Sequence, residues 1–334
     1  MFSLKNYNTF GIDAACSRFV EYDTVEALQS LLPEVVAGGK WMHIGGGSNL
    51  LFTRNFEGTI LHSRICGIEE VRRDAETVWV RVGAGEVWDE WVAEAVCRGY
   101  YGLENLSLIP GEVGASAVQN IGAYGAEAGQ FIETVETVEV ATGQRRSFAG
   151  EDCGYGYRSS IFKKELRGLH VVTHVVFRLS LRFVPQLSYR ALAAEVERRG
   201  ICPASLTAEG LRGLIIEVRR SKLPDPADLG SAGSFFMNPV VSAEKCASLL
   251  EQCPTMPHFP AEGGVKVPAG WLIEQCGWKG RRVGHAGVYE KQALVLVNHG
   301  GATGAEIWSL AQQIQADVQE KFGIAIHPEA NIIQ

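Results

Sequence analysis

The chain has 334 residues, of which 46% are hydrophobic and 21% charged, so it can bury a sizeable core and is not disordered. This length predicts two or three domains, or one large one. A net charge of −7 argues against general nucleic-acid binding, which usually needs a basic surplus. The first residues lack the apolar core of a signal peptide, and no apolar run approaches the roughly 18 residues of a membrane helix. We therefore expect a cytoplasmic protein with neither nucleic-acid nor membrane partners.

The cysteine and histidine spacings match neither a disulfide framework nor a metal site. The eight cysteines are sparse and no two have C-x-x-C spacing, so we interpret them as reduced thiols. His170 and His174 lie four residues apart, but in LHVVTHVVFRL, whose alternation is typical of a strand. No H-E-x-x-H motif occurs. We expect no metal ion.

The N-terminal half mixes helices and strands. A helix is predicted in EYDTVEALQSLL, where Asp23 and Glu26 have the spacing of a capping box before a stripe of leucines. Residues 77–85 alternate like a strand, and a helix that ends at Gly99 follows. A second alternating strand is predicted over 171–183.

The C-terminal half continues this mixture. A helix is predicted after Thr207, and KQALVLVNHG predicts a strand that runs into a turn. The strongest helix pattern has a Thr303–Glu306 capping box and ends at Gly323. Domain boundaries are suggested near Pro185, which interrupts a strand, and in SKLPDPADLGSAG. Because helices and strands do not alternate regularly, the predicted class is α+β.

Glycines gather in two segments. In HIGGGSNLLF, consecutive glycines expose N–H groups that can bind phosphate oxygens, although a turn at a strand end explains them equally well. The segment is not a dinucleotide fingerprint, because Leu50 replaces the third glycine, and it is not a P-loop. In IPGEVGASAVQNIGAYG, residues 109–125, glycines alternate with small and amide side chains, which suits a flat heterocycle with a pyrophosphate tail. Together the segments favour binding of a nucleotide cofactor.

The stretch GSAGSFFMNP holds one serine, Ser234, between small residues and two phenylalanines. One interpretation is a tight turn whose Phe235 and Phe236 fill the core, because glycine and serine are ordinary turn residues. The other is a reactive or ligand-contacting hydroxyl shielded from water. A serine hydrolase is disfavoured, because neither Ser48 nor Ser234 lies in a G-x-S-x-G elbow.

Seven segments occur in a characteristic order: GGGSNLLF, IPGEVGASAVQNIGAYG, YGYRSSIFK, SKLPDP, AGSFFMNP, LIEQCGWKG and PEANII. This set resembles the UDP-N-acetylenolpyruvoylglucosamine reductase family, the flavoenzymes of peptidoglycan precursor synthesis. The resemblance spans nearly the whole chain, and the second and fifth segments are the specific ones. LSYRAL, at 187–192, is similar to the tyrosine-bearing loop of one of the family's two types.

The resemblance implies a fold and a domain order. Residues 17–185 would form a two-lobed FAD-binding domain of the vanillyl-alcohol-oxidase (PCMH) type, with lobes of about 1–66 and 67–185. Residues 186–334 would form a smaller α/β substrate-binding domain, whose last residues return to the flavin side.

The resemblance also implies the reaction and its residues. NADPH would reduce a non-covalent FAD, and flavin N5 would then give hydride to the methylene carbon of UDP-N-acetylglucosamine enolpyruvate. Ser234 would protonate the adjacent carbon, and Arg158 and Glu329 would polarise the substrate carboxylate. The residues implied for the UDP moiety are Tyr189, Lys222, Asn238 and Gln292. Those implied for FAD are Gly45, Gly46, Gly47, Ser48, Asn49, Leu50, Gly111, Gly114, Ser116, Gln119, Asn120, Ile121, Gly122 and Tyr124.

Two residues depart from the family pattern. Met237 stands where we expect lysine, and Asn331 where we expect arginine, which removes two cations near the nucleotide and Glu329. The alternatives are another FAD-dependent oxidase or dehydrogenase of the same fold, and a nucleotide-sugar sensor that binds FAD without consuming NADPH.

Overall fold

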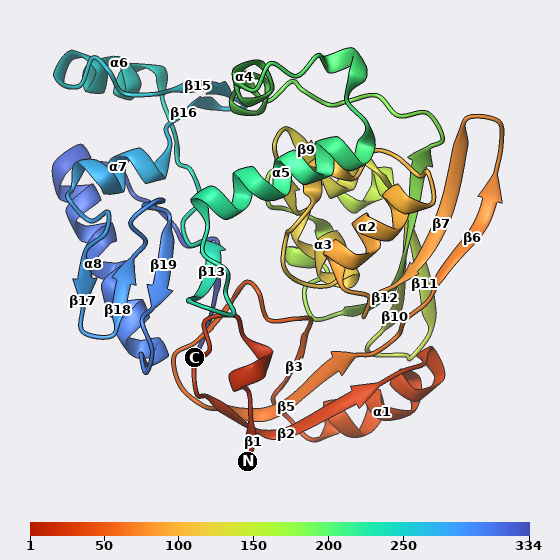
Figure 1. Ribbon diagram of the computed structural model, residues 1–334. Helices are drawn as coiled ribbons and strands as arrows, with labels where there is room; N and C mark the ends of the chain where they lie inside the picture. Colours follow the sequence, from red (N-terminus) through yellow and green to blue (C-terminus); the bar gives the residue numbers. More distant parts are fainter. The chain divides into compact units, whose positions relative to one another are not determined.

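The computed structural model describes residues 1–334, which divide into two compact units (Figure 1). The larger unit comprises Ser17–Gly46 and Glu57–Arg219. The smaller unit comprises Met1–Cys16, Gly47–Phe56 and Arg220–Gln334. Both contain helices and strands in irregular order, which confirms the α+β class. None of the helices combines the length and apolar character needed to cross a membrane.

The larger unit contains most of the strands and helices that precede residue 220. Its strands are β2 (Ala15–Tyr22), β3 (Trp41–Ile44), β5 (Phe56–Ser63), β6 (Ile68–Arg73), β7 (Thr77–Gly83), β8 (Gly122–Ala123), β9 (Ala126–Glu127), β10 (Ile132–Glu139), β11 (Arg145–Ala149) and β12 (His170–Ser180). Its helices are α1 (Val25–Ala37), α2 (Trp88–Cys97), α3 (Val113–Gln119), α4 (Arg190–Arg198) and most of α5 (Ala208–Lys222). An antiparallel sheet has the order β11-β10-β12-β7-β6, and a second sheet contains neighbouring strands in the order β2-β5-β3, with β3 parallel to β5.

The core of the larger unit forms where α2 and α3 cover one face of the antiparallel sheet (Figure 1). Trp88 and Trp91 of α2 are almost completely buried, and both rings lie within 6 Å of the Phe177 ring of β12. The predicted strands over 77–85 and 171–183 are confirmed as β7 and β12, which pair with each other. This packing fixes the loop that leaves α2 and leads into the second glycine-rich segment.

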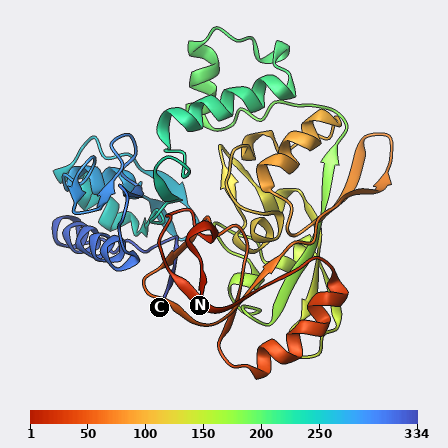
Figure 2. The same cartoon turned by 60° about the horizontal axis from the view of Figure 1, so that its bottom comes forward.

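Helix α1 begins one residue later than its sequence pattern predicts. The capping box of Asp23 and Glu26 is wrong, because the Thr24 hydroxyl accepts the N–H of Ala27 and makes Thr24 the N-cap. A threonine in this position satisfies one of the free N–H groups of the first turn. The buried face of α1 is nevertheless the predicted leucine stripe, which packs on β2 and β5 at one end of the unit (Figure 2).

Helices α4 and α5 pack against each other through their own apolar cluster (Figure 2). The predicted start of α5 is confirmed, because the Thr207 hydroxyl accepts the N–H of Gly210. The loop before α4 carries Tyr189, which lies against the β8–β9 hairpin of the same unit.

The smaller unit is built on the antiparallel sheet β13-β19-β18-β17, which α8 covers. Its strands are β1 (Phe2–Ser3), β4 (Leu50–Phe52), β13 (Gly230–Ser234), β14 (Val240–Val241), β15 (Phe259–Ala261), β16 (Gly264–Lys266), β17 (Arg282–Val283), β18 (Ala286–Val288), β19 (Val295–Asn298) and β20 (Asn331–Ile333). Its helices are α6 (Ala243–Gln252), α7 (Ala269–Gln275) and α8 (Gly304–Phe322). The predicted capping box of α8 is confirmed at Thr303 and Glu306, and Gly323 ends the helix with φ 61°.

The C-terminal strand β20 returns to the first glycine-rich segment. It pairs in parallel with β4, with Asn331 opposite Leu50 and Ile333 opposite Phe52. The C-terminal end of the chain thereby lies beside Leu50–Phe52, close after Gly47. Segments about 280 residues apart in sequence become neighbours in one small sheet.

Candidate active site

Ser234 follows a bulge at the end of β13. Ser231 pairs with Val297, whereas Ser234 pairs with Val295, so β13 carries one residue more than β19 between these pairs. Gly233 has φ 65°, a conformation that costs glycine little and other residues more. Bulges of this kind re-aim the side chains that follow them. Gly233 therefore sets the direction of Ser234, and it does so through its backbone conformation.

Gly230, at the other end of β13, is required for packing. A Cβ there would lie 2.3 Å from the carbonyl oxygen of Phe10. Phe235 and Phe236 are 0% and 1% exposed, and the Phe235 ring packs on those of Phe10 and Phe236. The interpretation of the two phenylalanines as core residues is thus confirmed. They anchor the chain directly after the partly exposed Ser234.

The C-terminal segment runs beside the residues that follow Ser234. The Glu329 N–H donates to the Phe235 carbonyl at 2.7 Å, and the Met237 N–H donates to the His327 carbonyl at 2.9 Å. These main-chain bonds place Glu329 beside Phe235, the residue that follows Ser234. Glu329 and Ser234 are 95 residues apart in the chain. Both of these contacts are made by main-chain atoms.

Asn49 joins this group from the first glycine-rich segment. Its side-chain amide donates to the Glu329 carbonyl at 3.2 Å, and its own carbonyl accepts the Asn331 N–H at 2.9 Å. The Asn331 side chain donates to the same carbonyl at 3.3 Å, so the asparagine that replaces the expected arginine still contacts this loop. Ser48 lies in the turn before β4, and a Cβ at Gly47 would overlap the Tyr7 carbonyl.

Two residues implied for the UDP moiety meet at the start of α7. The Asn238 side-chain oxygen accepts the N–H of Ala269 at 2.9 Å. A Cβ at Gly270 would lie 3.1 Å from the Gln292 side-chain oxygen, so Gln292 lies over the same helical turn. Lys222, the last residue of α5, is exposed and is not brought into this group by any contact.

In the larger unit, the two glycine-rich segments face each other. A Cβ at Gly46 would lie 3.5 Å from the Gly111 Cα, and one at Gly45 would lie 3.1 Å from a carboxylate oxygen of Glu112. The side-chain nitrogen of Gln119 is buried without a hydrogen-bond partner. Buried polar atoms of proteins almost always have a hydrogen-bond partner. An unpaired N–H donor near glycines, which have no side chain, therefore indicates a place for a ligand group. The residues present therefore fit FAD.

Several of the predicted FAD residues have structural partners of their own. Asn120 uses both amide hydrogens on Glu127 and Gly156, and its side-chain oxygen accepts the Gly129 N–H. The Ser116 hydroxyl donates to the Val113 carbonyl at 2.6 Å. Two other positions are explained by packing, because a Cβ at Gly114 would meet Ala84 and Ile121 lies against the main core. Asn120 has no side-chain N–H left for a cofactor.

The β8–β9 hairpin brings four predicted residues together. Tyr124 has φ 49° in its turn, and its ring meets the Tyr189 ring edge-on at 5.6 Å. The Arg158 guanidinium donates to the Gly122 carbonyl at 3.0 Å. Arg158 itself has φ 54°, an uncommon conformation that clusters at functional sites. Two residues implied for FAD thus make these contacts, Tyr124 with a residue implied for the substrate and Gly122 with one implied for catalysis.

We expect Gly122→Val to lower the FAD content of the folded protein. A branched side chain would meet the Ala126 carbonyl and the Glu127 side chain at 3.0 Å and Arg158 at 3.2 Å, which displaces the hairpin. The measurement is FAD per folded chain. Gly213→Val in α5, where a Cβ meets nothing within 4 Å, is the matched control. Full FAD content in folded Gly122→Val would contradict a role for the hairpin in cofactor binding.

Sequence reasoning missed Arg219. Its guanidinium is buried, its Nε has no hydrogen-bond partner, and burial lowers its pKa although Tyr124 and Asp89 act in the opposite direction. A buried guanidinium with a free donor suits an anion or a carbonyl of a ligand. The signal was present in RRSK, where only Lys222 was singled out. Arg220 and Lys222 are exposed whereas Arg219 is largely buried, a difference that a composition count does not reveal.

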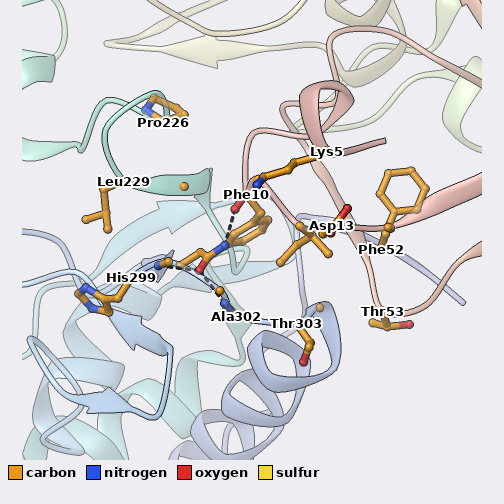
Figure 3. A pocket seen from close by; sticks show the side chains of 18 of the residues that line it. Lys5, Phe10, Asp13, Phe52, Thr53, Pro226, Leu229, His299, Ala302 and Thr303 are labelled. Atoms are coloured by element: carbon orange, nitrogen blue, oxygen red, sulfur yellow. Dashed lines mark hydrogen bonds between the residues drawn. The ribbon is translucent and has the colours of Figure 1, made fainter. Parts of the chain in front are cut away.

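The smaller unit also contains an open pocket of about 900 Å³ (Figure 3). Its wall includes Lys5, Asp13 and His299, and the Asn298 side chain bridges the Phe10 carbonyl and the turn before α8. None of the predicted catalytic, cofactor or substrate residues lines it. Cations and carboxylates are mixed in its wall, so the pocket does not select one sign of charge.

His170 and His174, whose surroundings predicted a strand, both lie in strand β12. His174 of β12 contacts Arg81 at 2.9 Å, and His170 contacts Thr137 at 3.0 Å. No group of three or more His, Cys, Asp or Glu residues has an arrangement suited to a metal ion. The eight cysteines are free thiols.

The whole chain is similar to known proteins. Residues 16–148 match the family described as FAD binding domain, and residues 225–333 match the family described as UDP-N-acetylenolpyruvoylglucosamine reductase, C-terminal domain. Two relatives named UDP-N-acetylenolpyruvoylglucosamine reductase, from Porphyromonas gingivalis and Bacteroides fragilis, are 51% and 50% identical. Each alignment covers 99% of this chain, and 98% and 99% of the respective relative.

A solved structure supports the fold. The crystal structure of UDP-N-acetylenolpyruvylglucosamine reductase from Thermus caldophilus aligns with a TM-score of 0.66 at 24% identity. The alignment covers 99% of this chain and 97% of that one. The predicted architecture, an FAD-binding domain with a smaller second domain, is confirmed.

Proposed function

The chain belongs to the UDP-N-acetylenolpyruvoylglucosamine reductase family, and from this premise we propose how its own residues carry the reaction. The protein is an FAD-dependent oxidoreductase that reduces UDP-N-acetylglucosamine enolpyruvate to UDP-N-acetylmuramate with NADPH, in peptidoglycan precursor synthesis. Bound FAD supplies the hydride at its N5 atom. The small-molecule UDP-sugar is its substrate, and we propose that it acts in the cytoplasm without nucleic-acid partners.

Ser234 is the proposed proton donor. Hydride addition to the methylene carbon leaves the neighbouring carbon in need of a proton, and a serine hydroxyl is a weak acid that must be held in line with that carbon. The bulge at Gly233 and the buried Phe235 provide such a fixed position. The observation that carries this proposal is the convergence of Ser234, Glu329 and Asn49 within the smaller unit.

Arg158 and Glu329 are proposed to act on the substrate carboxylate. Negative charge develops on that carboxylate as the hydride adds, and a guanidinium matches it with two parallel hydrogen bonds. One Arg158 nitrogen already donates to Gly122, which holds the group near the hairpin. The main-chain bond from Glu329 to Phe235 places the glutamate beside the residue that follows Ser234.

Binding is proposed to follow the two-domain division, with FAD on residues 17–185 and the UDP-sugar on 186–334. Gly45–Leu50 and Gly111–Tyr124 would line the cofactor, and the unpaired Gln119 amide is the side chain best suited to contact it. Asn238 and Gln292, gathered at the start of α7, are proposed to hold the nucleotide, together with Tyr189 and Lys222.

The test of this assignment begins with the purified protein. It should be yellow and release FAD on denaturation, and it should oxidise NADPH only when UDP-N-acetylglucosamine enolpyruvate is present. Consumption of an alcohol or a lactone without the UDP-sugar would favour another flavoprotein oxidase of this fold. Bound FAD with no NADPH turnover would favour a nucleotide-sugar sensor.

A further inference from the structure

A buried histidine in the larger unit is held between two carboxylates. The His62 Nδ1 lies 2.9 Å from an oxygen of Glu21, and its Nε2 lies 2.8 Å from an oxygen of Glu112. Only 5% of the His62 side chain is exposed, against 11% for Glu112 and 43% for Glu21. A neutral imidazole has one N–H, so it can satisfy only one ionised carboxylate; an imidazolium satisfies both. The geometry therefore favours a charged His62.

The charges around His62 favour a protonated His62 as the one buried cation. Burial lowers the His62 pKa, but hydrogen bonds and charge from Glu112 and Glu21 outweigh it, and the net pKa lies above the ordinary 6.5. On β3, burial and the nearby His62 lower the pKa of His43 to about 4, and this neutral ring pairs with the Tyr22 hydroxyl.

The remaining charge near the pair comes from Arg64, whose side chain is 4.0 Å from Glu21 and mostly exposed. The Phe19 ring covers one side of His62 at 6.0 Å. On the Glu112 side of His62, the other titratable groups nearby are Cys66 and Glu86. None of these groups supplies a second buried cation to Glu112.

Glu112 links His62 to both glycine-rich segments. It is the N-cap of α3 but makes no side-chain capping bond, because its carboxylate turns toward His62. The two carboxylate oxygens lie 3.1 Å and 3.7 Å from the Cβ positions of Gly45 and Gly46. A bare carboxylate in this place would repel the phosphates of a dinucleotide, and an imidazolium behind it removes most of that repulsion.

We propose that His62, as an imidazolium between Glu21 and Glu112, positions the carboxylate under Gly45–Gly46 and neutralises it, so that FAD retention depends on the protonation of His62. This inference rests on the proposed placement of FAD along these glycines. His62 is a positioning residue and need not contact the cofactor.

The proposal predicts the sign of a pH effect. A group whose pKa is raised by its folded surroundings stabilises those surroundings at low pH and loses this contribution as pH rises through its folded pKa. FAD affinity should therefore fall as pH rises through the raised pKa of His62 in the apoprotein, by up to about tenfold for each unit by which FAD raises that pKa further.

The experiment is titration of the apoprotein with FAD, followed by flavin fluorescence, from about pH 6 to about pH 9. His62→Gln cannot be charged, so it should bind FAD roughly tenfold more weakly near pH 6.5 and show no pH dependence. Glu112→Gln can donate an amide hydrogen to a neutral His62, so it should keep FAD affinity within about threefold of wild type and also lose the pH dependence.

The control is His174→Gln, a second largely buried histidine of the same unit that lies beside Arg81 and Glu136. It should leave the pH profile of the wild type intact. ¹⁵N NMR of the apoprotein provides a readout that does not involve FAD: both His62 nitrogens should carry protons at neutral pH. A singly protonated His62, or an FAD affinity that does not depend on pH in wild type, would overturn the inference. Failure of the wild type to bind FAD at all would instead overturn the proposed function.

Discussion

Ser234→Ala is expected to slow reoxidation of the reduced flavin by the UDP-sugar enolpyruvyl ether by at least about two orders of magnitude, the usual contribution of a positioned general acid. The hydroxyl that would protonate the substrate carbon is lost, while the bulge at Gly233 and the buried Phe235 remain. Reduction of the flavin by NADPH should proceed at close to the wild-type rate. Stopped-flow absorbance resolves the two half-reactions.

Ser242→Ala is a matched control for this experiment. Ser242 is a serine of the same unit whose hydroxyl caps α6, so its loss should cost about 1 kcal/mol of stability and leave both half-reactions unchanged. If reoxidation of Ser234→Ala stays within a few-fold of wild type, Ser234 is a turn residue and not the proton donor.

Glu329→Gln is expected to slow reoxidation by the substrate by about tenfold or more, with little effect on reduction by NADPH. Glutamine keeps the size of the side chain and can donate a hydrogen bond, but it cannot change protonation. The segment should stay in place, because Glu329 holds Phe235 and Asn49 through its main chain. The two half-reactions are again separated by stopped flow.

Glu320→Gln, an exposed position on α8, tests for a general effect of removing one negative charge. It should change neither half-reaction. Equal slowing of both half-reactions in Glu329→Gln would assign the C-terminal segment a role in folding and not in catalysis.

Elements whose signals lie within one turn or one strand could be predicted from the sequence. The Thr303–Glu306 capping box, the Gly323 end of α8 and the Thr207 start of α5 all follow from contacts between residues three or four apart. The α1 start was displaced by one residue because Thr24 and Asp23 are both good N-caps and only the tertiary path of β2 into α1 chooses between them.

The residue types of the candidate site were also visible in the sequence, through the two glycine-rich segments and Ser234. Their roles were not equally visible. Gly233 forms the bulge of β13, and Gly230 leaves room for the Phe10 carbonyl. Asn120 donates both of its amide hydrogens to residues of its own unit. A one-dimensional pattern shows that a side chain is small or polar, but not which atom occupies the space beside it.

By itself, the sequence determined the α+β class, the local elements and the family, because caps, alternation and motif order depend on neighbours along the chain. Only the tertiary structure decided that Glu329 lies beside Phe235 and Asn49, and that Glu112 reaches His62. These contacts join residues about 50 to 280 apart. They form because burying distant apolar segments such as Phe235 and β4 brings their polar neighbours together, and no local propensity encodes that outcome.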